Sequence, residues 1–345
     1  MKNGLIILLL SLVIAPFAQA ADNLSVSLET LISAEPLERK PPKYPRLAAK
    51  KGQEGWVRLS FVIDEQGNVI DPIVHDSSGV ERFEKAALKA VKDWKYSPAM
   101  VDGKPVEQCN SKVQLDFRLG EQEKGVTRQF LKKYKKLRNA VIEGDIELAD
   151  DLYTEFKEES HHNFSESVHA AVVSATYFSA KQDVPQMTRE LETIANNGYK
   201  FLGEESYLSL SGRLLMLKIE QNKLSEALEL IAKINEVVDA DASGLAPIKE
   251  MQNKLQQYIE NNQYLVVKGK IHSHKAWYHQ LLLNKFDLVS EGNAFERIEI
   301  RCKNKRSTYS NFEKQGFAIP EDWGQCHIYV DAPQGTEFSL VEYSS

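Results

Sequence analysis

The spacing of apolar residues between positions 55 and 119 changes in an order that few folds accommodate. Residues 56–63 and 69–75 favour strands, with a polar turn around Gly67 between them. Residues recurring at helical spacing follow, namely Phe83, Ala86, Ala87, Ala90, Val91 and Trp94. After a turn at Gly103, apolar and polar residues alternate through residues 112–119, as in a half-buried strand. This order predicts a small β-β-α-β unit of the α+β class, in which one helix covers a three-stranded sheet.

The rest of the chain contains two regions with different residue patterns. Residues 126–262 show a helical pattern throughout, and polar breaks at Asp145, Asp183 and Lys223 recur every 40 residues or so. Such a period favours stacked helix pairs of the tetratricopeptide type, in a degenerate form, and an irregular helical bundle is the alternative. Residues 264–345 contain short β-rich runs separated by turns, which predicts a small β-sandwich.

The three cysteines suggest one disulfide. Cys302 and Cys326 lie on strand-like stretches of the last domain, and an exported protein would pair them. Cys109 then has no cysteine to pair with, and we expect it to be a buried free thiol.

The β-β-α-β unit carries a series of spaced short motifs. They are Tyr44-Pro45, Gly52-x-x-Gly55-x-Val57, Val62-Ile63-Asp64, Gly67-x-Val69, Ser77-Ser78-Gly79, Trp94-Lys95-Tyr96-Ser97-Pro98-Ala99 and Gly103-Lys104-Pro105-Val106. In their order and distances they resemble the C-terminal domain of the TonB family. The resemblance covers less than a quarter of the chain.

The resemblance implies a function for the closing strand. In the TonB family this region pairs with a short N-terminal box of outer-membrane receptors by strand addition, which uses the unpaired backbone groups of an edge strand. The stretch before the Tyr-Pro motif also contacts the partner, and an aromatic residue of the Trp-x-Tyr segment can serve the surface. The residues implied here are Pro41, Pro42, Lys43, Tyr44, Tyr96, Val113, Gln114, Leu115, Asp116 and Phe117. In the alternative arrangements, the closing strand pairs in a homodimer or is covered by the helical region.

The N-terminus predicts export. Lys2 precedes an apolar run over residues 5–17 and an Ala-Gln-Ala sequence that ends at Ala20. The run is short for a membrane span, which needs ~20 apolar residues. We therefore expect a signal peptide over residues 1–20, cleavage after Ala20 and a periplasmic protein. A retained anchor in the inner membrane is the alternative.

The expected domains are a linker over residues 21–40, the TonB-like unit over 41–120, the helical repeats over 126–262 and the β-domain over 264–345. TonB energy transducers cross the periplasm on a long proline-rich spacer, whereas this linker has one proline, Pro36. The transducers' motor-contacting transmembrane histidine also has no counterpart, because residues 5–17 contain no histidine.

The sequence contains no phosphate-binding loop, dinucleotide fingerprint or nucleophile elbow, so we expect neither catalysis nor a cofactor. The candidate metal ligands are His161-His162 and His272-x-His274. For both pairs, exposed histidines that bind no metal are the favoured interpretation. The net charge of −6 gives no reason to expect nucleic-acid binding. The basic run at residues 132–136 is read as a solvated helix face, with contact to anionic lipid or glycan as the alternative.

The leading hypothesis is a periplasmic protein that docks an extended peptide of an outer-membrane receptor or another envelope protein, in or beside TonB-dependent transport. The alternatives are a membrane-anchored energy transducer driven by an inner-membrane motor complex, and an envelope scaffold that binds peptidoglycan. An enzyme with its site in the β-domain is the remaining class, and His272 and His274 would be tested first.

Overall fold

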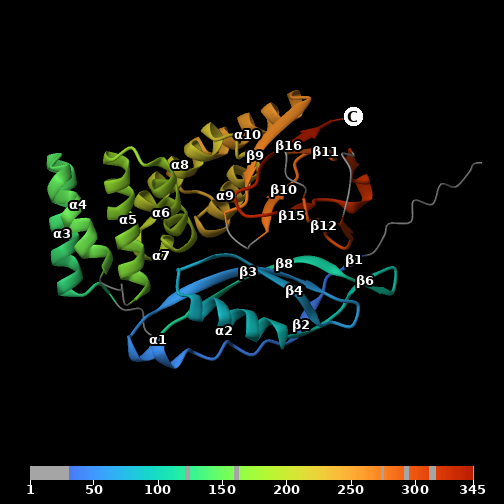
Figure 1. The fold of residues 1–345 in the computed structure, drawn as a ribbon, viewed down its shortest axis with the longest axis horizontal. Coiled ribbons are helices and arrows are strands. Elements are labelled where there is room, and N and C mark those ends of the chain that lie inside the picture. The colour runs from blue at the N-terminus through green and yellow to red at the C-terminus, as the bar shows by residue number, and fades with distance from the viewer. Residues whose placement is uncertain are drawn as a thin grey trace, which may run out of the picture.

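A computed structural model describes residues 31–120, 125–158, 163–272, 276–290, 295–310 and 316–344. It has the expected α+β composition in three parts: a β-rich first domain, a set of helices and a small β-region (Figure 1). The signal peptide and the His161-His162 pair lie outside the described residues, and so does His274.

The first domain is a three-stranded antiparallel sheet with one long helix on it. The strands are β3 (Gly55–Ile63), β4 (Val69–Ser77) and β8 (Gln108–Phe117), in the order β4-β3-β8, and the helix is α2 (Glu81–Lys92). Alternate residues of β3 form a core with α2, including Val57, Leu59 and Phe61 against Phe83 and Val91. The predicted β-β-α-β order is therefore confirmed, and the short helix α1 (Arg46–Lys50) precedes it.

The structure adds short strands that the sequence pattern did not predict. They are β1 (Leu31–Ile32), β2 (Glu35–Glu38), β5 (Lys95–Ser97), β6 (Ala99–Val101) and β7 (Lys104–Val106). Strand β1 pairs with β6, and β2 pairs with β5. The described part of the expected linker thus belongs to the first domain, because backbone pairing holds it although its side chains are exposed.

The second part is a series of antiparallel helices. It comprises α3 (Arg128–Glu143), α4 (Ile146–Glu158), α5 (Phe164–Ala180), α6 (Val184–Asn197), α7 (Tyr199–Leu202), α8 (Glu204–Glu220), α9 (Leu224–Val237) and α10 (Ala246–Asn261), with a 3₁₀ turn at Ser243–Leu245. Helix ends follow local chemistry: the Thr127 side chain caps α3, and Gly144 ends it in the left-handed conformation with φ 78°. Successive pairs pack on each other through α3 against α5 and α6 against α8, as in a helix-pair array. The basic run lies on α3, where Lys133 pairs with Glu155 of α4.

The third part is a β-sandwich. One sheet has the order β10-β15-β12-β13 and the other β14-β11-β16-β9. The strands are β9 (Tyr264–Lys270), β10 (Trp277–Gln280), β11 (Lys285–Ser290), β12 (Arg297–Arg301), β13 (Arg306–Tyr309), β14 (Phe317–Ala318), β15 (His327–Asp331) and β16 (Glu337–Tyr343), with a 3₁₀ turn at Glu321–Trp323. Both sheets contribute to one core, and the predicted disulfide between Cys302 and Cys326 joins the ends of the neighbouring strands β12 and β15.

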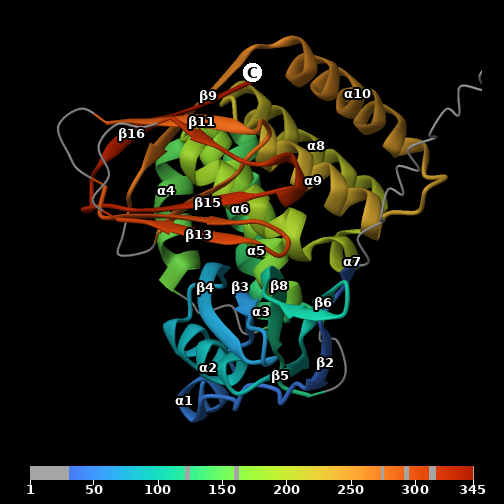
Figure 2. The ribbon, with the colours of Figure 1, turned by 90° about the vertical axis from the view of Figure 1, so that its right-hand side faces the viewer.

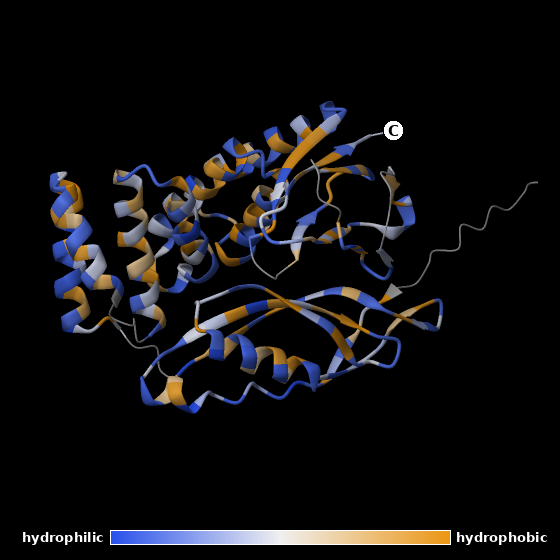
Figure 3. Ribbon diagram, in the orientation of Figure 1, coloured by the Kyte–Doolittle hydropathy of each residue, from blue (hydrophilic) through white to orange (hydrophobic). Residues whose placement is uncertain are grey.

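The three parts are stacked in layers. Helix α2 covers one face of the first-domain sheet, and the helices and the sandwich lie over the opposite face (Figures 1 and 2). Hydrophobic and hydrophilic segments alternate along β3 and β8 (Figure 3), as expected for strands whose two faces meet different surroundings. We refer to residues 125–344 as the tail.

Candidate interaction surface

Strand β8 lies at the edge of the first-domain sheet. It pairs with β3 along one side, from Gly55 opposite Phe117 to Ile63 opposite Gln108. In the described part of the chain no strand pairs with its other side. The five residues expected on the docking strand, Val113, Gln114, Leu115, Asp116 and Phe117, therefore lie on an edge strand, which presents backbone N–H and C=O groups to a further chain.

The side chains of β8 alternate between two different environments. Val113, Leu115 and Phe117 point to the α2 side and belong to the first-domain core. Phe117 stacks on Phe83 with ring centres 4.3 Å apart. These side chains are engaged in packing, so the odd-numbered positions hold the strand in place and leave its outer backbone as the accessible feature.

Three even-numbered side chains of β8 contact the tail. Lys112 Nζ donates to Glu229 Oε1 of α9 at 2.9 Å and lies 3.3 Å from Nε2 of His327 on β15. Gln114 Nε2 donates to Asn197 Oδ1 at the end of α6, at 3.0 Å. Asn110 Nδ2 lies 3.0 Å from His327 Nδ1. Both the helices and the sandwich therefore fix the register of β8 through side chains, while its outer backbone edge stays outside these contacts.

The charges of this contact depend on each other. Burial alone would raise the pKa of Glu229, but the hydrogen bond from His327 and the charge of Lys112 outweigh it and lower the pKa to about 2. Burial lowers the pKa of His327, against the opposing effect of Glu229. At neutral pH the contact therefore holds a carboxylate between an ammonium group and a neutral imidazole.

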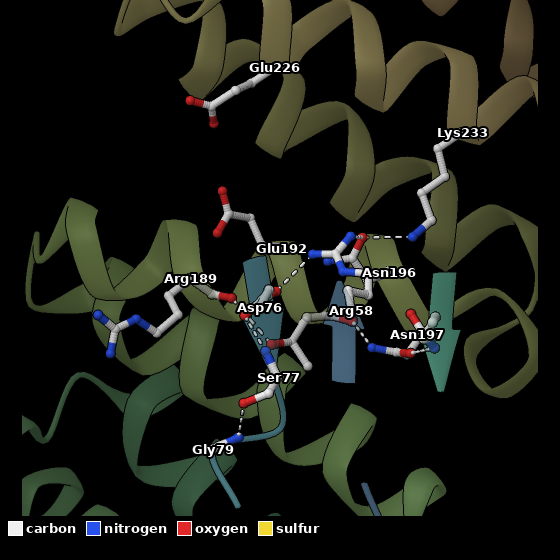
Figure 4. Close-up of polar contacts among 12 residues, drawn as sticks. Arg58, Asp76, Ser77, Gly79, Arg189, Glu192, Asn196, Asn197, Glu226 and Lys233 are labelled. Carbon is white, nitrogen blue, oxygen red and sulfur yellow. Dashed lines mark hydrogen bonds and ion pairs between the residues drawn. The ribbon is translucent and has the colours of Figure 1, made fainter. Parts of the chain in front are cut away.

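A second polar contact joins β3 and β4 to the helices. Arg58 donates to Asp76 Oδ2 at 2.8 Å and to Asn196 Oδ1 at 2.5 Å, and Lys233 donates to the same Asn196 oxygen at 2.6 Å (Figure 4). Burial, followed by the nearby Arg58 charge, lowers the pKa of Lys233 to about 8. The end of α6 and the middle of α9 are thereby fixed over the sheet.

His75 of β4 is one of the contacts between the sheet and the sandwich. Its Nε2 lies 2.7 Å from Ser60 Oγ, and its ring packs edge-on against Tyr278 with centres 4.2 Å apart. Burial, with a smaller effect of Lys112, lowers the pKa of His75 to about 3. The imidazole is therefore neutral at physiological pH, and this becomes important for stability in acid.

The residues expected before the Tyr-Pro motif lie near one end of β8. Tyr44 packs edge-on against both Phe83 and Phe117, and its hydroxyl donates to the carbonyl of Gln53. Pro41 and Lys43 are exposed and Pro42 is partly exposed. The structure thus brings Tyr44 and Phe117 together, with the exposed positions next to them.

Tyr96 lies elsewhere in the first domain. Its side chain is 4% exposed and packs against Phe61, and its hydroxyl accepts a 2.7 Å hydrogen bond from Arg39 Nε. The Arg39 guanidinium also lies over the Trp94 ring, 5.0 Å from its centre. A partner reaches Tyr96 only if the Arg39 segment moves, so its role in binding stays a prediction.

One side-chain arrangement has the composition of a catalytic triad. Ser225 Oγ lies 3.2 Å from His279 Nδ1, and His279 Nε2 lies 2.9 Å from Glu342 Oε1. All three are buried, with Ser225 1% exposed, and the second oxygen of Glu342 accepts from the amides of Leu282 and Leu283. A hydroxyl without access to solvent cannot attack a substrate, so the group joins α9 to both sheets of the sandwich.

The remaining candidates have simple structural roles. Cys109 is a buried free cysteine, as expected, and burial raises the pKa of its thiol to about 12. His272 is exposed, and its carbonyl accepts from Gln334. Among the residues that the structure covers, no three His, Cys, Asp or Glu side chains are placed to hold a metal ion. No helix in the same residues is long and apolar enough to cross a membrane.

Sequence reasoning did not find the tail residues that hold β8. Glu229, Asn197 and His327 lie 117, 83 and 215 residues from their β8 partners. Each is an ordinary polar residue in its own helix or strand, so no local pattern distinguishes it.

The first domain is an α+β module with one helix on a three-stranded sheet, and comparison with known proteins identifies it. Residues 40–119 match the family described as Gram-negative bacterial TonB protein C-terminal. These residues form a TonB C-terminal domain.

Curated relatives are similar to a part of this chain. The TonB protein of Vibrio cholerae is 48% identical over 65 residues, which cover 19% of this chain and 27% of that protein. The tonB2 protein of Pseudomonas aeruginosa is 39% identical over 83 residues, covering 24% and 30%. The chain thus spans between a quarter and a third of the length of these two relatives. The tail lies outside the residues that match the family.

Two solved structures are also similar to a part of this chain. The solution structure of the Pseudomonas aeruginosa TonB C-terminal domain is 28% identical and covers 26% of this chain and 91% of its own, with a TM-score of 0.24. The structure of the TonB2 protein of Vibrio anguillarum is 44% identical, with coverages of 26% and 84% and a TM-score of 0.22.

Proposed function

We propose that this protein docks an extended segment of an outer-membrane TonB-dependent receptor, or of another envelope protein, by adding it as a strand to β8. The observation that supports the proposal is the edge position of β8 in a TonB C-terminal domain. Main-chain hydrogen bonds along Val113, Gln114, Leu115, Asp116 and Phe117 supply affinity, and neighbouring side chains supply selectivity. The protein acts in the periplasm, in or beside TonB-dependent transport, and performs no catalysis.

Contacts with the tail pre-organise the docking strand. Lys112 and Gln114 of β8 are held by α9 and α6, and Arg58 and His75 hold the neighbouring strands in the same way. A sheet held on one face by the rest of its own chain is pre-organised, which lowers the ordering cost of strand addition.

The test of strand addition is a titration of the full chain with synthetic receptor N-terminal peptides. In an extended peptide, alternate N–H groups face the strand it joins, so methylating those amides removes hydrogen bonds and keeps every side chain. Losing two such bonds, at about 1 kcal/mol each, weakens binding about 30-fold. Methylating the other set of amides is the matched control and leaves affinity unchanged. Equal affinity of all three peptides would contradict strand addition.

The periplasmic location rests on residues 5–20 and has its own test. Cleavage after Ala20 gives a mature protein that begins at Ala21, which N-terminal sequencing detects. A mature protein that retains residues 5–17 would instead support the membrane-anchored energy transducer.

A further inference from the structure

The end of the β8 edge is already paired by another part of the chain. Strands β3 and β8 shift register between Phe61 and Ile63, which leaves Cys109 without a Cα partner on β3. The backbone N–H of Cys109 donates instead to the carbonyl of Lys303, at 3.1 Å. Lys303 lies in the turn between β12 and β13, so a hairpin of the sandwich occupies the first residues of β8.

This hairpin is anchored at both edges of the first-domain sheet, at β4 and next to β8. Arg306 of β13 pairs with Asp71 of β4 and with Glu107, directly before β8, at 3.1 Å. Arg301 of β12 donates from Nη1 to the carbonyl of Asp71 at 3.2 Å. The hairpin is therefore a fixed part of the docking surface.

The opposite end of the edge is the end of β8 itself. The N–H of Leu119 donates to Glu54 Oε1 at 2.9 Å, and the Arg118 guanidinium lies 4.7 Å from the centre of the Phe164 ring on α5. Between these two ends, residues 111–117 of β8 have no backbone partner in the described chain other than β3. A strand rises about 3.3 Å per residue, so the open edge matches an added strand of about seven residues.

The hairpin end of this edge is basic. Lys303 and Lys305 are exposed, and the Lys112 side chain is 46% exposed although it pairs with Glu229. The acids at this end are engaged: the buried Glu299 holds Arg301 at 2.7 Å, and Asp71 and Glu107 both pair with Arg306. The end of an added strand next to the hairpin therefore meets positive charge.

We propose that the β12–β13 hairpin limits the docking edge to residues 111–117 and selects an extended partner that carries an acidic residue at the end next to the hairpin. This inference rests on the proposed function and adds the length and charge of the partner. The hairpin belongs to the tail, so the tail takes part in partner selection.

The charge part is tested with the full chain and seven-residue probes of alternating Thr and Val that carry Glu or Lys at either end. The probe that carries Glu at the end next to the hairpin binds about fivefold more tightly than the probe that carries Lys at that end. The reason is that exposed ion pairs contribute up to about 1 kcal/mol each. The double variant Lys303→Glu/Lys305→Glu reverses this preference. The matched control Lys89→Glu/Lys92→Glu has the same charge change on α2 and keeps it.

The length part is tested by amide exchange and by probe length. Bound probe slows exchange in residues 111–117 and leaves Cys109 unchanged. Arg306→Gln releases the hairpin, so Cys109 exchanges faster and a ten-residue probe gains affinity relative to the seven-residue one. Lys270→Gln is the control, because Lys270 pairs with Glu337 on the other sheet of the sandwich, away from the hairpin.

The outcomes separate the two proposals. Binding without charge preference, or protection that extends over Cys109 in the unmodified chain, overturns the inference and leaves strand addition intact. Absence of binding by every probe and by receptor peptides overturns both.

Discussion

His75 shows how one residue couples the first domain to the tail. Burial against Ser60 and Tyr278 holds its ring neutral. The positive charges of Lys112 and Arg58 act in the same direction, and Glu229 acts in the opposite direction. The pKa is lowered from 6.5 to about 3, so between these values the unfolded chain binds a proton that the folded chain excludes. Stability is therefore full above pH 6.5 and falls as the pH drops towards 3.

The first prediction concerns this histidine. Between pH 7.5 and 5.5, excluding the proton costs the native chain about 1.4 kcal/mol. His75→Gln keeps a polar partner for Ser60 and removes the titration, so the variant loses less stability over the same interval. Chemical unfolding at the two pH values measures the difference. Equal pH dependence in both proteins would contradict the assignment of His75 as a buried neutral group.

The second prediction separates two roles of Tyr44. Its hydroxyl donates to Gln53, and its ring packs on Phe83 and Phe117. Tyr44→Phe removes only the hydrogen bond and lowers the free energy of unfolding by about 1 kcal/mol. If the role of Tyr44 is structural, peptide affinity stays unchanged in this variant, and a large loss of affinity with unchanged stability would place Tyr44 in the partner contact.

At the scale of elements, sequence predicted the type of most strands and helices but not all their limits. Strand β8 begins at Gln108, whereas alternation of apolar and polar residues begins only at Lys112. Asn110 and Cys109 do not fit an amphipathic pattern, and they join the strand because His327 and Lys303 supply partners. The short α7 was missed for a similar reason, since four residues are too few for a periodic signal.

The third prediction concerns the side-chain contact between α9 and β8. Glu229→Gln removes the carboxylate between Lys112 and His327 and leaves a charged group with a weaker partner, which costs about 1–3 kcal/mol. Amide exchange in β8 accelerates, and exchange in α2 changes little. Glu236→Gln, an exposed site on the same helix, serves as the control. Unchanged exchange in β8 would show that the odd-numbered core side chains alone fix the strand.

At the scale of the whole molecule, the sequence indicated three parts and could not arrange them. The first domain was predictable because its motifs are local and regularly spaced. The surface between the sheet and the tail consists of polar pairs such as Arg58 with Asn196, 138 residues apart, and no local pattern encodes them. The candidate strand was found, and the tail residues that limit it were not.

The fourth prediction follows from the covered face of the sheet. Trp56 and Val62 of β3 are buried although they lie outside the core beneath α2. A chain that ends at Gly120 exposes this face, and exposed apolar patches favour association. Sedimentation should show a higher ratio of measured to sequence mass for the truncated chain than for the full chain. A monomeric truncated chain of unchanged stability would contradict a covering role of the tail.

The central claim is that β8 receives an extended partner. Hydrogen–deuterium exchange of the full chain, with and without a peptide from the N-terminal box of a TonB-dependent receptor, tests it most directly. We expect slower exchange in residues 111–117 and little change in the helices α3 to α6. Binding that protects the helices and leaves residues 111–117 unchanged would contradict it.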